Sequence, residues 1–255
     1  MLATQSFGSD TTLPPILIVH GLFGSGRNWG VIAKRLSQSR RVLSVDMRNH
    51  GDSFRAESQS YADMAGDLAE VIAAHGGIAD VIGHSMGGKA AMVLALTRPD
   101  TVRRLLIADI APVSYPQTGE HHALIAAMKS LDLSAIETRG DADRALAAAI
   151  PSPSVRAFLL QSLDVKGKVW RLNLDVLDRE LPSIRAFPEL SGEFSGPTLF
   201  LAGGVSDYIL PEHRATIRSL FPAAKQAKLP GVGHWLHAEK PRDFEATAEA
   251  FLGGE

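Results

Sequence analysis

The residues best suited to covalent chemistry lie in the segment Gly83-His84-Ser85-Met86-Gly87, which has the form Gly-x-Ser-x-Gly. A short apolar run at 79–82 precedes the segment and predicts a buried strand, and a run of small residues at 89–97 predicts a helix. Glycines suit such a strand-to-helix turn because the helix backbone packs closely on the strand. The pattern therefore predicts that Ser85 is a nucleophile on a strained turn.

A serine hydroxyl is a weak nucleophile, so it needs a base that accepts its proton during attack. The base is usually oriented by a carboxylate. Where the nucleophile lies on a turn of this kind, the chain order is serine, acid, histidine. Of the nine histidines, His234 follows a predicted strand at 224–229 and lies on a glycine turn near the end of the chain. His234 is therefore the predicted general base.

The oxyanion that forms during attack needs N–H donors. The predicted strand at 15–19 runs into a glycine-rich loop at 20–26. We expect one donor from the backbone of Met86 and the other from this loop, at Leu22 or, alternatively, at Phe23. The loop matches neither the phosphate-binding nor the dinucleotide-binding glycine pattern in a strand–turn–helix setting.

Two aspartates compete for the role of the acid. Asp207 follows a predicted strand at 199–202 and a glycine turn, which is the usual place for the carboxylate in this arrangement. Asp109 ends another predicted strand at 103–109 and precedes Ile-Ala-Pro. Either carboxylate could reach an imidazole from the carboxyl edge of a sheet, and position along the chain favours Asp207.

The rest of the pattern predicts an α/β fold. Apolar strand runs alternate with helix patterns up to residue 109 and again from residue 197, which is typical of a mostly parallel sheet flanked by helices. We assign 1–112 and 197–255 to this core.

The stretch 113–196 lacks strand alternation, and helices are predicted within it at 144–150 and 155–163. We interpret it as a helical cap inserted after the strand that ends at Asp109. Some of its apolar side chains are expected to line an acyl pocket above Ser85.

Composition excludes several classes of function. The chain has 255 residues, a net charge of −2 and no cysteine. The length suits one globular core with an insertion. The near-neutral charge gives no basic surface for binding nucleic acid, and the absence of cysteine excludes thiolate chemistry. The first twelve residues have no signal-peptide pattern, and no apolar run approaches the ~20 residues that a membrane helix requires. We expect a cytoplasmic protein without a membrane span.

Segment 46–53, Asp-Met-Arg-Asn-His-Gly-Asp-Ser, resembles the Asp-x-Arg-Gly-x-Gly-x-Ser segment of α/β-hydrolases, with Asn49 in place of a glycine. Four further motifs follow the same order, at 20–24, 83–89, 109–112 and 233–241. Together they make the chain similar to the small bacterial esterase/thioesterase group that is related to the mitochondrial α/β-hydrolase domain-containing proteins of the eleventh type.

This resemblance implies an α/β-hydrolase fold with Asp109 as the triad acid and Ser206 as an accessory member of the site. Asp207 stays the alternative acid, because this chain keeps an aspartate where members of the group often lack one. The implied enzyme is a serine esterase that hydrolyses small or medium acyl esters, and acyl-coenzyme A thioesters as further candidates, through an acyl-enzyme.

A perhydrolase or a carbon–carbon bond hydrolase would use the same triad, and a non-catalytic ligand-binding protein is the alternative from another class. We expect no metal and no cofactor, a small-molecule acyl ester as the partner, and a monomer or small homo-oligomer.

Overall fold

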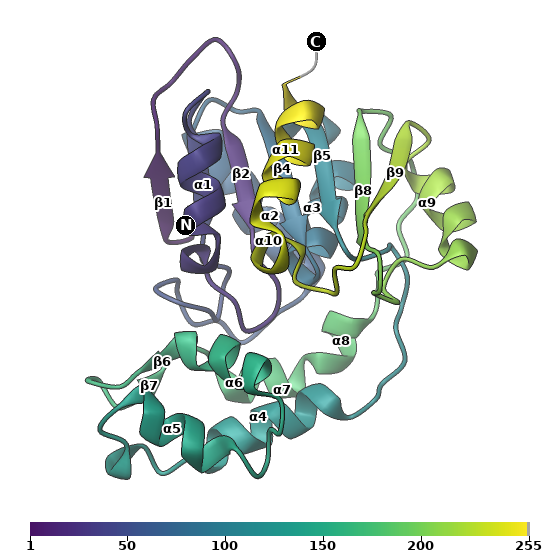
Figure 1. Cartoon of the computed structure of the whole chain (residues 1–255). Helices are drawn as coiled ribbons and strands as arrows, with labels where there is room; N and C mark the ends of the chain where they lie inside the picture. The colour runs from purple at the N-terminus through teal and green to yellow at the C-terminus, as the bar shows by residue number, and fades with distance from the viewer. Residues whose placement is uncertain (254–255) are drawn as a thin grey trace.

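The structure is a computed structural model, and it describes residues 1–253. Its centre is a seven-stranded sheet (Figure 1). The strands are β1 (Thr4–Phe7), β2 (Ile16–Val19), β3 (Val42–Val45), β4 (Ala79–His84), β5 (Val102–Ala108), β8 (Thr198–Gly203) and β9 (Ala224–Leu229). Their order is β1-β3-β2-β4-β5-β8-β9; β1 runs antiparallel to β3, and all other neighbours are parallel. The predicted mostly parallel α/β sheet is confirmed.

Helices cover both faces of this sheet. They are α1 (Gly30–Leu36), α2 (Tyr61–Ala74), α3 (Met86–Thr97), α9 (Arg214–Leu220), the short α10 (Leu236–Glu239) and α11 (Pro241–Leu252). Side chains of β2 alternate between the faces: Ile16 and Ile18 join the apolar layer of α1 and α11, whereas Leu17 and Val19 join that of α2 and α3. Strands β2, β3, β4 and β8 are buried along their whole length because both faces are covered.

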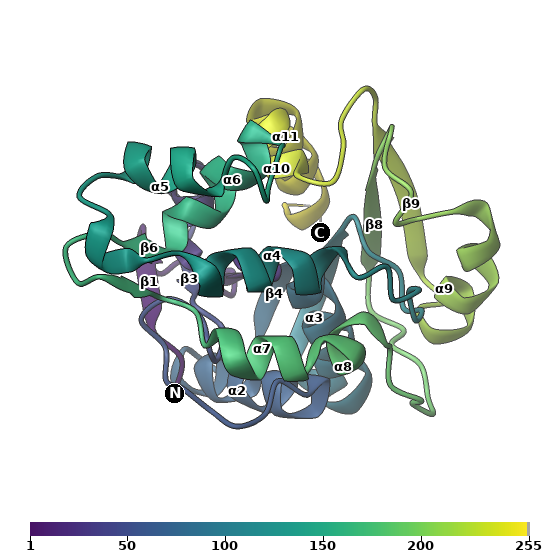
Figure 2. The ribbon, with the colours of Figure 1, turned by 90° about the horizontal axis from the view of Figure 1, so that it is seen from below.

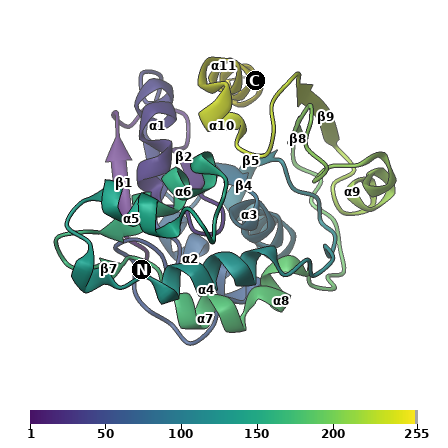
Figure 3. The same ribbon diagram turned by 60° about the horizontal axis from the view of Figure 1, so that its bottom comes forward.

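Five helices lie beyond the carboxyl ends of the parallel strands (Figures 1 and 3). They are α4 (Glu120–Ser130), α5 (Arg139–Leu146), α6 (Pro153–Leu159), α7 (Leu174–Arg179) and α8 (Leu181–Arg185). Viewed from below, α4 and α7 lie side by side across this end of the molecule (Figure 2). This arrangement suits a cap, although the domain bounds at 113 and 196 stay a prediction.

The structure corrects three expectations for the cap segment. The segment is not wholly helical, because β6 (Leu163–Asp164) and β7 (Val169–Trp170) form an antiparallel pair. The helix predicted at 144–150 is α5, which begins earlier because the Thr138 side chain and Asp141 cap its first turn reciprocally. The helix predicted at 155–163 ends at Leu159 and continues as a 3-10 turn.

Strand β1 is absent from the sequence prediction. Its residues are only partly buried, so it lacks the apolar run that marks the inner strands, and it forms by pairing with β3. Among the residues that the structure describes, no helix is both long and apolar enough to cross a membrane.

Candidate active site

Ser85 lies on the turn that joins β4 to α3, with φ 52° and ψ −120°. This backbone conformation is rare for a residue with a side chain and marks a strained turn. Two glycines make the turn sterically possible. A Cβ at Gly87 would lie 2.4 Å from the carbonyl oxygen of His20, and a Cβ at Gly83 would lie 2.6 Å from the carbonyl oxygen of Gly87. The turn holds Ser85 at the carboxyl edge of the sheet.

His234 and Asp109 meet at the same edge. His234 Nδ1 lies 2.8 Å from Asp109 Oδ2. Asp109 is fully buried, and its carboxylate is fully engaged: Oδ1 accepts a hydrogen bond from the Gly203 N–H at 2.8 Å, and Oδ2 accepts one from Ser206 Oγ. A carboxylate at Nδ1 favours the tautomer that carries its proton there, which leaves Nε2 as a proton acceptor.

The competing aspartate is placed differently. Asp207 is exposed, and within residues 1–253 its carboxylate hydrogen-bonds to no other residue. The structure thus brings Asp109 to the imidazole, joins Ser206 to the same carboxylate oxygen, and leaves Asp207 in solvent. The catalytic role of each residue stays a prediction.

Two residues that the sequence analysis did not single out hold His234 in place. The Tyr208 ring stacks on the imidazole, with centroids 4.1 Å apart and an interplanar angle of 23°. His84 Nε2 donates to the carbonyl oxygen of His234 at 2.8 Å. Burial lowers the pKa of His84 well below its usual value, so the ring is neutral. In the sequence, the position of His84 beside Ser85 was the one sign that His84 belongs to the site.

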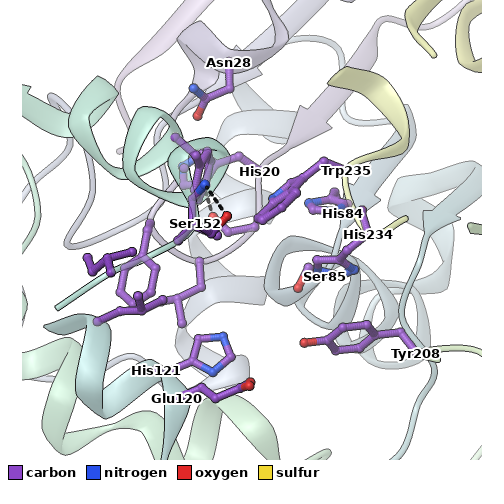
Figure 4. A pocket seen from close by; sticks show the side chains of 18 of the residues that line it. His20, Asn28, His84, Ser85, Glu120, His121, Ser152, Tyr208, His234 and Trp235 are labelled. Carbon is purple, nitrogen blue, oxygen red and sulfur yellow. Dashed lines mark hydrogen bonds between the residues drawn. The ribbon is translucent and has the colours of Figure 1, made fainter. Parts of the chain in front are cut away.

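Ser85 and His234 line one cavity of about 470 Å³. Figure 4 shows them on one side of the cavity with Tyr208, and His121 faces them from α4. In the part of the chain that the structure describes, no hydrogen bond joins Ser85 Oγ to His234. Such nucleophile–base contacts are often looser before substrate binds.

The glycine-rich loop discriminates between the two candidate oxyanion donors. The Phe23 N–H already donates to His50 Nε2 at 3.2 Å. Burial lowers the pKa of His50 to about 3, so its ring is neutral and able to accept. Within residues 1–253, the N–H groups of Leu22 and Met86 donate to no protein acceptor. The geometry therefore favours Leu22 over Phe23 as the partner of Met86.

The segment after β3 supports this loop. Asp46 accepts a hydrogen bond from the Gly26 N–H at 2.7 Å, and Arg48 forms a two-bonded ion pair with Asp67. Asn49 takes φ 64°, a left-handed conformation that asparagine tolerates better than most residues with a side chain. These contacts are structural.

The large cavity is mainly apolar away from the polar groups near Ser85. Its cap wall consists of side chains from α4, α6 and the loop between α5 and α6, among them Leu124, Ile150, Val155 and Phe158. In the described residues, no group of three or more His, Asp or Glu side chains is placed to hold a metal ion.

Residues 16–247 match the model of the alpha/beta hydrolase family. The chain belongs to this family. Among its relatives, the sn-1-specific diacylglycerol lipase ABHD11 of Mus musculus is 45% identical over 260 residues, which cover 98% of this chain and 85% of the relative. Esterase YbfF of Escherichia coli strain K12 is 40% identical over 228 residues, which cover 89% and 88%.

A solved structure, described as a marine microorganism esterase, is also similar. It has a TM-score of 0.92 and 37% identity, with 98% of each chain covered. Together with the family match, these relatives identify the chain as a carboxylic ester hydrolase, and the resemblance noted in the sequence is confirmed.

Proposed function

We propose that this protein is a serine esterase that cleaves small or medium acyl esters through Ser85, His234 and Asp109. The observation that carries the proposal is the 2.8 Å contact between His234 Nδ1 and a fully buried Asp109 carboxylate, beside a strained Ser85 in the same cavity. A structural ion pair alone would not explain why an imidazole and a serine hydroxyl share an apolar cavity.

Acylation follows from these positions. As Ser85 Oγ attacks the ester carbonyl carbon, His234 Nε2 takes the hydroxyl proton, and the carbonyl oxygen becomes an oxyanion facing the N–H groups of Leu22 and Met86. When the tetrahedral intermediate collapses, the bond to the leaving oxygen breaks and His234 returns its proton to that oxygen. The products are a Ser85 acyl ester and an alcohol.

Deacylation repeats these steps with water as the nucleophile. His234 takes one proton from the water, the hydroxide oxygen bonds to the acyl carbon, and the proton then goes to Ser85 Oγ as the free acid leaves. Each oxyanion donor is expected to contribute roughly 3–4 kcal/mol to lowering the barrier. Asp109 keeps its negative charge throughout and stabilises the imidazolium. A cytoplasmic location, thioester substrates and the oligomeric state stay predictions.

Hydrolysis of p-nitrophenyl acetate and butyrate by wild type and by Ser85→Ala tests the proposal. We expect activity in the wild type and a loss of at least roughly 10³-fold in the variant. An acyl-chain series, offered as oxygen esters and as coenzyme A thioesters, then compares the two leaving groups. A folded wild type that binds small ligands but cleaves none of these compounds would refute the esterase function and favour a binding protein.

A further inference from the structure

Arg185, the last residue of α8, brings an uncompensated positive charge to the candidate active site. Within residues 1–253 its guanidinium forms no ion pair, and its Nε atom is buried without a hydrogen-bond partner. Its Nη1 donates to His121 Nδ1 at 3.2 Å, so the imidazole fixes the guanidinium without neutralising it. Buried polar atoms are normally satisfied, and an exception calls for an explanation.

A second cationic group lies beside it. Lys89 is only 1% exposed, and its Nζ donates to the carbonyl oxygens of Arg185 and Ala186 at 2.8 and 2.7 Å. The same Nζ lies 4.8 Å from the centre of the Tyr115 ring. Burial, followed by the charge of Arg185, lowers the pKa of Lys89 to about 7. Arg185 therefore gives the pocket a positive charge that no contacting carboxylate among the described residues cancels, and Lys89 adds to this charge only when it is protonated.

The acidic groups that influence this region do not neutralise it. Glu120 acts on His121, and Asp109 and Asp207 act on Tyr208, but none of the three contacts Arg185. Glu120 and Asp207 are exposed, and the buried Asp109 carboxylate is already bonded to His234, Ser206 and the Gly203 N–H. Exposed charges are screened by solvent and salt far more than the groups inside the pocket are. An anion that entered the pocket would be the first charged partner of the guanidinium within residues 1–253.

Arg185 and Lys89 line a small cavity of about 40 Å³ that also touches Ser85. Leu22 and Met86, the two candidate oxyanion donors, belong to its wall. A volume of this size holds roughly three water-sized groups. The cavity therefore suits a carboxylate on a short tether and excludes a long chain.

The position of His234 decides which part of an ester enters each cavity. The leaving oxygen must lie next to His234 to receive its proton, and His234 lines the large apolar cavity. Ser85 and Leu22 line both cavities, whereas His234 lines only the large one and Met86 only the small one. The alcohol of the ester thus faces the large cavity, and the acyl substituent faces the small one.

We propose that the small cavity binds the free carboxylate of a short dicarboxylic acyl group, so that the preferred substrates are half-esters of the malonate or succinate class with an apolar alcohol. This inference rests on the proposed esterase function. The Arg185 guanidinium donates to the carboxylate, and His121 fixes its orientation. The expectation that the cap lines an acyl pocket then changes: its apolar side chains contact the leaving alcohol.

Matched esters of benzyl alcohol test this assignment, with the released alcohol measured by chromatography. Monobenzyl succinate carries the carboxylate, and benzyl levulinate is a neutral ester of similar shape. In the wild type we expect a higher kcat/KM for the succinate half-ester. Arg185→Met should lower that preference about 10- to 100-fold, and Arg185→Lys should lower it less.

Two controls are made on each variant: hydrolysis of the neutral benzyl levulinate and the midpoint of unfolding. Both variants change the Arg185 side chain but keep the backbone carbonyl that Lys89 binds. A second measurement uses only the wild type: free succinate should inhibit levulinate hydrolysis more strongly than butyrate does. Equal inhibition by the two acids, or an equal loss on both esters in Arg185→Met, would overturn the carboxylate site. A wild type that cleaves neither ester and no p-nitrophenyl ester would instead overturn the esterase function itself.

Discussion

Replacing Asp109 by asparagine tests which carboxylate orients His234. The Gly203 N–H donates to Asp109 Oδ1, so the amide oxygen of the new asparagine must stay at that position. Its NH₂ group then faces His234 Nδ1, where Asp109 Oδ2 now lies at 2.8 Å. An NH₂ donor favours the tautomer with an unprotonated Nδ1, which places the proton on Nε2. An Nε2 that already carries a proton cannot accept one from Ser85.

The size of the effect follows from these contacts. Restoring the productive tautomer would give up the hydrogen bond to a charged acceptor, about 1.5–3 kcal/mol, and leave two buried donors facing each other, about 1–3 kcal/mol. At 1.36 kcal/mol per tenfold change in rate, turnover should fall about 10²- to 10⁴-fold. The exposed Asp207 has no such contacts, so Asp207→Asn should change turnover by no more than about twofold.

The assay is kcat for p-nitrophenyl butyrate at pH 8 with wild type, Asp109→Asn and Asp207→Asn. Circular dichroism and the thermal midpoint of each variant show whether the fold is retained. A folded Asp109→Asn variant with near-normal turnover, or a larger loss in Asp207→Asn, would refute the assignment of the acid.

Two further predictions concern stability. Gly87→Ala should destabilise the protein by about 1–3 kcal/mol, because the new Cβ would lie 2.4 Å from the carbonyl oxygen of His20. Gly66→Ala lies in α2, where a Cβ meets nothing within 4 Å, and should stabilise the protein by roughly 0.5–1 kcal/mol. Thermal denaturation that ranked the two glycine variants in the opposite order would contradict both expectations. Burial lowers the pKa of Lys89 from 10.5 to about 7 in the folded chain. Between these two pH values the unfolded chain therefore binds more protons than the folded chain. The stability of wild type relative to Lys89→Met should rise with pH across this window, by up to about 1.4 kcal/mol per pH unit. Urea denaturation at pH 7 and pH 9 measures this difference, and the same slope in both proteins would show that Lys89 does not titrate as described.

Several elements could be predicted from the sequence because their signals are local. An apolar run predicted a strand at 15–19, and β2 spans Ile16–Val19. The glycine turn that holds His234 predicted the end of the strand at 224–229, which is β9 with the same bounds. The glycines around Ser85 likewise predicted a strand, a sharp turn and a helix in that order, as observed. In each case the decisive residues lie within about ten positions of one another.

Other features could not be predicted from the sequence because the residues that form them are distant along the chain. The edge strand β1 depends on pairing with β3, which lies more than thirty positions further along the chain. Nothing in the sequence shows that the Phe23 N–H is taken by His50, or that the Arg185 guanidinium lacks an ion-pair partner within residues 1–253.

The choice of acid shows the same division most clearly. By itself the sequence determined an alternating α/β chain with a serine and a histidine on glycine turns, because glycine spacing and apolar runs act on nearby backbone. It could not decide from these patterns which aspartate reaches His234, and chain position favoured Asp207. Only the tertiary structure sets β5 next to β8, and this neighbourhood brings the buried Asp109 carboxylate to an imidazole 125 positions further along the chain while Asp207 stays in solvent.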